Sequence, residues 1–157
     1  MRSDPDHNLP PGLQEDGDFS DMLSEMRILL PGAQMLSAFL IILPFNADFV
    51  NIVKSEKYVF LATFFFALSS LILLSAPAVQ HRIMRPLLHR ERFKTFASRQ
   101  IVAGSIALGI AFVLGTNLVI SEVFGEAVGL AAAAVMGILV VITWWVLPIV
   151  IKRHRPI

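Results

Sequence analysis

Four long apolar segments, none of which contains Asp, Glu, Lys, Arg or His, constrain the fold of this 157-residue chain more than any other feature. They cover residues 28–45, 58–79, 101–120 and 127–151, and Leu, Ile, Val, Ala and Phe dominate them. A helix needs roughly 20 predominantly apolar residues to cross the hydrocarbon core of a bilayer. Each segment is close to that length or above it. The sequence therefore predicts an all-α protein, an integral membrane bundle of four transmembrane helices.

The composition argues against the soluble classes of protein. Charged residues make up 16% of the chain and the mean hydropathy is +0.69, whereas soluble domains contain about 25% charged residues. The chain has no cysteine, which excludes disulfides and thiolate metal ligands. It also contains no recognisable nucleotide-binding glycine loop, metal-ligand cluster or nucleophile motif. We therefore expect no cofactor, no metal and no nucleic-acid partner, and a function other than catalysis.

The basic residues predict how the chain is oriented. Of the 13 Lys and Arg residues, all but Lys54 and Lys57 lie before residue 28, between the second and third segments, or after the fourth. Lys and Arg accumulate in cytoplasmic loops of membrane proteins. Both termini and the central loop are therefore expected in the cytoplasm.

The chain divides into three parts along its length. Residues 1–19 are rich in acidic side chains, Pro and Gly, and are expected to form a disordered acidic tail. Residues 20–153 are expected to form the four-helix membrane domain, and residues 154–157 a basic C-terminal end. The spacing of apolar residues upstream of the first segment predicts that its helix begins near Ser20.

Small residues recur at every fourth position in the third and fourth segments. In lipid, helices associate where small residues let their backbones approach closely. The pattern predicts a tight antiparallel hairpin with a turn at Gly125, and packing either within the bundle or, alternatively, between two copies. The residues are Ala103, Ala107, Ala111 and Gly115 in the third segment and Gly125, Gly129, Ala133 and Gly137 in the fourth.

Few polar side chains fall inside the segments. Gln34 is the most polar residue of the first segment, Ser37 follows it by about one turn, and Asn117 lies near the end of the third. Polar groups at membrane depth are costly and need partners, which Ser37 or a neighbouring helix could supply for Gln34. Two interpretations stay open, namely an interhelical hydrogen bond and a polar path for a substrate or an ion.

A cluster of basic residues follows the second segment. His81, Arg82 and Arg85 lie at its expected cytoplasmic end. Arginines at this depth extend to lipid phosphates, so contact with the headgroups of membrane lipid is the first interpretation. A pH-responsive cluster is the second, because histidine titrates near neutral pH. A reaction on a lipid substrate at His81 and Arg82 is the third.

Several short motifs resemble those of a known family. They are Glu25-Met-Arg27, Gly32-Ala-Gln34, Ala38-Phe39-Leu40, Leu43-Pro44-Phe45, Ala76-Pro77, His81-Arg82 and Trp145-x-x-Pro148. Over residues 20–153 the chain resembles a bacterial, mainly actinobacterial, family of small four-span membrane proteins of unknown function. Some members of that family are labelled sodium:proton antiporters. The resemblance implies a multi-pass protein of the bacterial inner (plasma) membrane.

Two hypotheses about function follow from these features. The first is a non-enzymatic interaction protein, either an accessory subunit of a larger membrane complex or a homo-oligomer. The second is a transporter or antiporter of a monovalent cation or proton, with Gln34, Asn117 and Ser or Thr hydroxyls along its path. Sodium:proton antiporters exchange ions at a buried carboxylate, and the four segments contain none. The residues therefore favour the first hypothesis.

Overall fold

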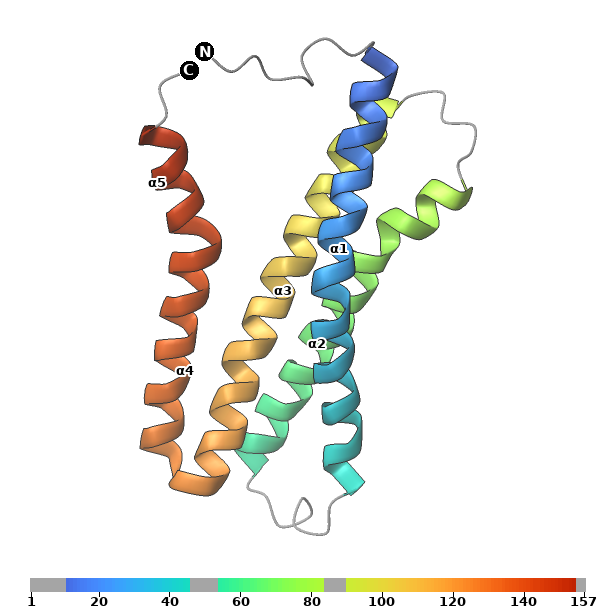
Figure 1. The fold of residues 1–157 in the computed structure, drawn as a ribbon. Coiled ribbons are helices and arrows are strands. Elements are labelled where there is room, and N and C mark those ends of the chain that lie inside the picture. The colour runs from blue at the N-terminus through green and yellow to red at the C-terminus, as the bar shows by residue number, and fades with distance from the viewer. Residues whose placement is uncertain (1–10, 46–53, 84–89, 155–157) are drawn as a thin grey trace.

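Helices make up almost all of the structure, a computed structural model that describes residues 11–45, 54–83 and 90–154 (Figure 1). The four long helices run alternately up and down, and short elements extend two of them. In order, the elements are α1 (Pro11–Ile42), η2 (Leu43–Phe45), α2 (Lys54–Ile83), α3 (Arg90–Phe124), α4 (Glu126–Val141), η4 (Ile142–Val146) and α5 (Leu147–His154).

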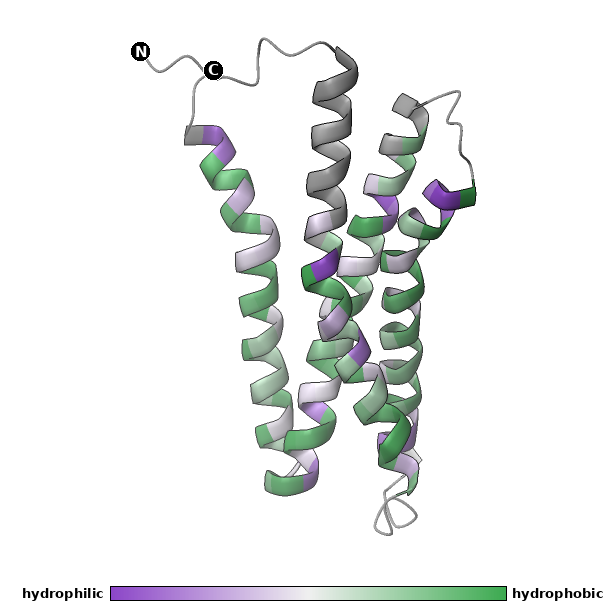
Figure 2. Cartoon of the chain, turned by 45° about the vertical axis from the view of Figure 1, so that its right-hand side comes forward, coloured by the Kyte–Doolittle hydropathy of each residue, from purple (hydrophilic) through white to green (hydrophobic). Residues whose placement is uncertain are grey.

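Each of the four helical rods is long and apolar enough to cross a membrane. The spans are Met26–Phe45, Ser55–Ile83, Thr95–Phe124 and Glu126–Arg153. Hydrophobic residues predominate along all four (Figure 2). The three longer spans have 28 to 30 residues, which corresponds to about 42–45 Å of helix and matches a bilayer with its headgroup regions. The predicted all-α fold with four membrane-spanning helices is thus confirmed.

The first helix begins earlier than the hydropathy pattern predicts. The structure places residues 11–19 in α1, where a disordered acidic tail is expected, and residues 1–10 lie outside the described residues. Pro11 occupies the first helical position, where its missing N–H costs nothing. Extending an existing helix also avoids the cost of nucleating one. These local effects account for a helix that continues beyond the apolar segment.

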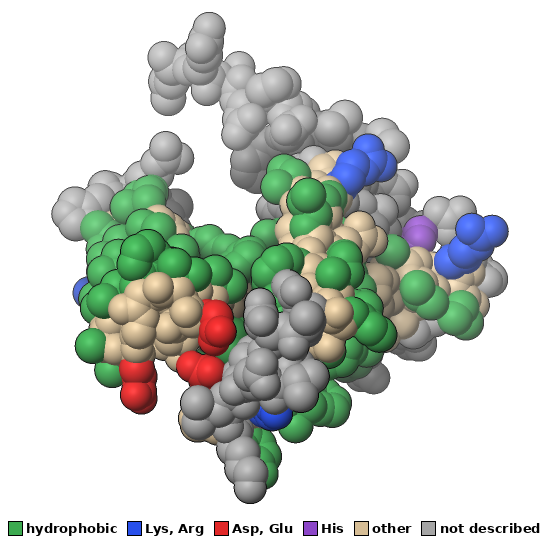
Figure 3. Space-filling model, turned by 90° about the horizontal axis from the view of Figure 1, so that it is seen from below, with side chains coloured by type: hydrophobic (Ala, Val, Ile, Leu, Met, Phe, Trp, Pro, Cys, Tyr) green, Lys and Arg blue, Asp and Glu red, His purple; other side chains and the backbone are tan. Residues whose placement is uncertain are grey.

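The two ends of the bundle differ in charge. We call the end at which α2 finishes and α3 starts the basic end; it lies at the top of Figure 1. The exposed side chains of Arg82, Arg99, Lys152 and Arg153 lie toward it. The opposite end carries the α3–α4 turn, and we call it the turn end. Figure 3 shows the molecule from the turn end, with acidic side chains beside the α3–α4 turn.

The core lies between α1, α2 and α3. Two clusters of buried side chains fill it, and each takes one residue from every one of these helices. Gly104 lets α2 and α3 approach closely, because a Cβ there would lie 2.9 Å from Leu74 Cγ. The clusters are Ala33, Leu74 and Leu108, toward the basic end, and Leu40, Ala67 and Ala111, toward the turn end.

The fourth helix packs mainly against α3. Among the described residues it makes no comparable contact with α1 or α2, and only Gly129 and Ala133 are buried along it. A Cβ on Gly129 would lie 2.7 Å from the Cβ and 2.8 Å from the backbone nitrogen of Ser121. The backbones of α3 and α4 therefore lie directly against each other there. Gly125 turns the chain with φ 91° and ψ 162°, a conformation essentially restricted to glycine.

Two of the predicted small residues of α3, Ala111 and Gly115, face α1 and α2 and not α4. Ala111 belongs to a core cluster with α1 and α2, and a Cβ on Gly115 would contact the side chains of Thr63 and Leu36. The small residues of α4 instead meet Ser121 and, at Gly137, the side chain of Val113. Because α3 is covered on two sides, Ala111 and Gly115 meet the other helices of the core. Gly109 and Ser121 meet the α4–η4 helix instead, and Ala103 is exposed.

Candidate functional site

Hydroxyl groups inside the spans donate hydrogen bonds to carbonyl oxygens of their own helices. Ser37 Oγ donates to Ala33 O at 2.8 Å, and Thr63 Oγ1 donates to Val59 O at 2.7 Å. Serine and threonine commonly bond back to the preceding turn in this way. Their donors are thus used locally and are not directed at a path through the bundle. The same pattern holds for Ser70, Ser105, Thr116, Ser121 and Thr143.

The predicted polar residues do not form one site. The side chain of Gln34 is exposed on the outer surface of α1, whereas Ser37 is buried, with 4% of its surface exposed. Ser37 bonds to Ala33 rather than to Gln34. Asn117 is half-buried on α3 toward the turn end. The structure therefore separates the three residues that a shared ion path would bring together.

Two glutamines just outside the predicted segments have buried side-chain oxygens. They lie toward the basic end. Gln80 on α2 and Gln100 on α3 each have a side-chain Oε1 that is closed off from solvent and accepts no hydrogen bond within the part of the chain that is described. An unpaired buried acceptor costs about 1–3 kcal/mol. Each glutamine lies one residue outside a predicted segment. The antiparallel order of the second and third segments could have revealed them, because it places these two positions at nearly the same depth.

The predicted basic cluster is described only in part. His81 is half-buried, and its ring centroid lies 6.2 Å from that of Phe93 on α3, with the ring planes 44° apart. Arg82 is exposed, and Arg85 lies outside the described residues. His81 thus packs between the ends of α2 and α3, while Arg82 lies on the surface of the basic end.

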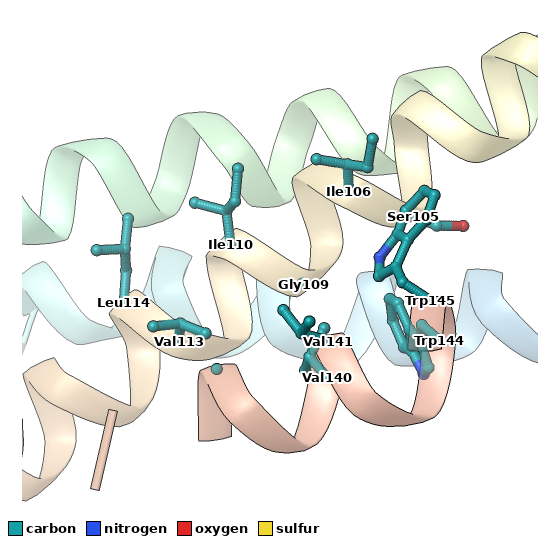
Figure 4. A pocket seen from close by; sticks show the side chains of 11 residues that line it. Ser105, Ile106, Gly109, Ile110, Val113, Leu114, Val140, Val141, Trp144 and Trp145 are labelled. Atoms are coloured by element: carbon teal, nitrogen blue, oxygen red, sulfur yellow. The ribbon is translucent and has the colours of Figure 1, made fainter. Parts of the chain in front are cut away.

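A groove of about 250 Å³ runs between α3 and the α4–η4 helix (Figure 4). Ser105 is the only residue with a hydroxyl in its lining, and its Oγ already donates to Ile101 O at 2.9 Å. The groove is therefore apolar along its length. Its lining consists of Ser105, Ile106, Gly109, Ile110, Val113 and Leu114 from α3 and of Gly137, Val140, Val141, Trp144 and Trp145 from the other helix.

Pro148 explains why two consecutive tryptophans reach this groove. Proline has no N–H to donate to the carbonyl of Trp144, and its ring clashes with that carbonyl. The preceding residues form a π-helical turn, η4, in which the N–H of Leu147 donates to Ile142 O. Such a turn inserts one extra residue into a helix. Trp144 packs against the three-helix core, while Trp145 lies at the surface with 38% of its area exposed.

A second groove, of about 300 Å³, lies between α1 and α3 toward the turn end. It is also apolar, with Thr116 as its polar residue, and the Thr116 hydroxyl donates to Phe112 O. The two grooves differ at their ends, since only the α3–α4 groove contains tryptophan. The lining of the second groove is Leu36, Phe39, Leu40, Phe112, Gly115, Thr116, Leu118, Val119 and Ile120.

Residues 12–148 match a protein family described as "Family of unknown function (DUF6328)". The chain belongs to this family. The matched range begins within α1 and ends at Pro148, so it includes both grooves and the two glutamines. No curated protein and no solved structure matches the chain. Membership confirms the expected family of unknown function and assigns no activity.

Proposed function

We propose that this member of the family is a non-enzymatic membrane protein that acts by binding another membrane helix. It works either as a homo-oligomer or as an accessory subunit of a larger complex. Its expected location is the bacterial inner (plasma) membrane with both termini in the cytoplasm. The distribution of the 13 Lys and Arg residues supports that orientation. The observation that carries the proposal is the exposed side chain of Gln34.

Gln34 lies deep within the first span. It is eight residues from the start of the span at Met26, about 12 Å along the helix. A polar group that faces hydrocarbon without a partner costs roughly 2–7 kcal/mol. Pairing with a polar group on a second helix removes much of that cost, and such pairs hold membrane helices together. An exposed amide at this depth is therefore typical of a contact with a helix outside the bundle.

The surface around Gln34 suits close contact between helices. Exposed residues recur along α1 and into η2 at alternating steps of four and three, which places those of α1 on one face of the helix. Ala38 is small and lets a second backbone approach near the amide. We call this surface the α1 stripe; it consists of Arg27, Pro31, Gln34, Ala38, Ile41 and Phe45.

Disulfide cross-linking tests whether the α1 stripe has a partner. The natural chain has no cysteine, so Ala38→Cys introduces a single thiol on the stripe. Oxidation in native membranes should give a product of twice the monomer mass if the partner is a second copy. A second experiment uses a reagent that reacts with this thiol at one end and with a neighbouring chain at the other. A heavier adduct identified by mass spectrometry would indicate an accessory subunit. Val135→Cys is the control, since Val135 is 66% exposed on α4. Equal or absent cross-linking at both positions would refute the proposal.

Gln34→Leu measures the contribution of the amide to this association. A hydrogen bond between membrane helices contributes about 1–2 kcal/mol in model peptides, so association should weaken about 5–30-fold. Energy transfer between labelled copies in liposomes, or co-purification with the partner, measures the effect. Met35→Leu is the matched control, because Met35 is 77% exposed and already apolar. Wild-type association of Gln34→Leu would overturn the role assigned to the amide.

A transporter or antiporter of a monovalent cation or proton is the second candidate function. The observation in its favour is the pair of buried, unpaired oxygens on Gln80 and Gln100, because carbonyl oxygens are ligands for monovalent cations. Purified protein in vesicles with sodium, potassium or pH gradients tests it directly. Flux that Gln100→Leu abolishes would support transport. No flux above that of empty vesicles would exclude it.

A further inference from the structure

The α3–α4 groove lies at the middle of the third span. Its lining on α3 extends from Ser105 to Leu114, about 13–14 Å along the helix axis, and Ser105 lies ten residues inside the start of the span at Thr95. The lining is apolar and the groove is narrow, with a volume of about 250 Å³. An extended hydrocarbon chain can therefore lie along it.

The mouth of the groove carries two indole rings. Trp145 lies beside Ser105 at the end nearer the basic end, with Trp144 next to it (Figure 4). Neither indole N–H donates a hydrogen bond to any residue that the structure describes. The mouth lies about 12–15 Å inside the ends of the two spans at Thr95 and Arg153. The indole rings therefore line the path that an acyl chain takes from the headgroups into the groove.

Three exposed basic side chains lie beyond the mouth, on the same two helical rods. Arg99 precedes Ser105 by six residues, and Lys152 and Arg153 follow Trp145 by seven and eight. These separations correspond to about 9–12 Å along the axis, which places the three side chains nearer the headgroups, where Lys and Arg extend to lipid phosphates. The acidic side chains that the structure describes lie at the turn end instead. The charge beyond the mouth is thus complementary to a negative headgroup.

The second groove, between α1 and α3, is a useful comparison because it is also apolar. It has a similar volume, of about 300 Å³, but its lining contains no tryptophan. It ends near Ile120, next to Ser121 and Glu122, at the end that carries the acidic side chains. The lining residues that the structure gives for this groove include neither a tryptophan nor a basic side chain.

We propose that the α3–α4 groove is a binding site for one anionic phospholipid of the surrounding bilayer. One acyl chain passes the indole rings and lies against Gly109, Ile110 and Val141, and the basic side chains beyond the mouth bind the phosphate. This site lies on α3, α4 and α5, away from the α1 stripe. It therefore goes beyond the proposed interaction function and does not depend on it.

Tryptophan fluorescence can read out this site without a label. The chain has 2 tryptophans, and both line the groove. The full chain in nanodiscs of phosphatidylcholine is titrated with phosphatidylglycerol brominated on its acyl chain, because bromine quenches tryptophan on contact. Phosphatidylcholine with the same brominated chain is the matched probe. Half-maximal quenching should need at least about fivefold less of the anionic lipid, as the basic groups beyond the mouth each add affinity for negative charge.

Variants distinguish binding of anionic lipid at the groove from attraction of anionic lipid to basic side chains elsewhere on the protein. The combined variant Arg99→Gln, Lys152→Gln and Arg153→Gln should lose the preference for the anionic lipid. Arg27→Gln combined with Arg82→Gln removes basic groups on α1 and α2, and should keep it. Ser105→Leu should weaken quenching by filling the mouth, at unchanged helical circular dichroism. Equal quenching by both lipids, or an undiminished preference in the triple variant, would overturn the proposal. So would efficient Val141→Cys cross-linking between copies, because a second copy would then occupy the groove.

Discussion

Gly129 is the residue whose replacement tests the contact between α3 and α4 most directly. A Cβ added there would lie 2.7, 2.8 and 2.9 Å from the Cβ, nitrogen and Cα of Ser121, whereas ordinary contacts of a Cβ start at 3.4 Å. Two of these three atoms belong to the backbone, so no change of rotamer can move them away. Gly129→Ala must therefore push the two helices apart by roughly 0.5–1 Å or strain them.

The free-energy cost of this change can be separated from the effect on helix propensity. Inserting a methyl group into a packed contact costs about 1–3 kcal/mol, while alanine in place of glycine favours a helix by up to about 1 kcal/mol. Gly137→Ala is the matched control two turns away on α4, because its Cβ would lie 3.6 Å from Val113 Cγ2. The propensity effect is shared by both variants. The difference between their free energies of unfolding should thus be the steric cost, about 1–3 kcal/mol.

Unfolding in mixed micelles of increasing SDS content measures this difference. Tryptophan emission reports on the α3–α4 contact, because Trp144 and Trp145 lie on the helix that continues α4 and line the groove against α3. We expect Gly129→Ala to unfold at lower SDS content than the wild type, and Gly137→Ala at equal or higher content. Equal free energies of unfolding for the two variants would refute the direct backbone contact at Ser121.

Two further predictions concern η4 and the buried glutamines. Pro148→Ala restores the N–H that can bond to the Trp144 carbonyl, so η4 should become a regular α-helix. The two indole rings should then leave the groove; a tryptophan emission spectrum identical to that of the wild type would contradict this. Gln100→Leu replaces an unpaired buried acceptor and should raise the free energy of unfolding by about 1–2 kcal/mol, measured by the same SDS titration. Destabilisation by Gln100→Leu would instead show that this oxygen has a partner in the membrane.

The four spans were predictable because hydrophobic length alone decides whether a helix can cross a bilayer. Their ends were less predictable, as α1 shows. Its apolar segment begins at residue 28, whereas the helix begins at Pro11, because helix continuation depends on local backbone bonding and not on hydropathy. The turn at Gly125 followed from the spacing of small residues, and the structure places it there with a positive φ.

The directions of side chains could not be read from the spacing of small residues. Ala107 and Ala111 repeat every fourth residue as Gly129 and Ala133 do, and periodicity alone does not say which neighbour each face meets. Only the arrangement in space shows that Ala111 lies against α1 and α2. Gln80 and Gln100 went unnoticed because each lies one residue beyond a hydropathy boundary. Pairing the second and third segments in antiparallel register would have brought them together.

The attachment of α4 mainly to α3 has a consequence for how the chain comes apart. The α1–α2–α3 core has buried clusters that draw on all three helices, so no one of them can leave without opening the core. The fourth helix is joined by a single seam and one glycine turn. A pulling force at the C-terminus therefore opens this seam first and leaves an intact three-helix remainder, which makes the loss of α4 a separate and earlier step than unfolding of the core.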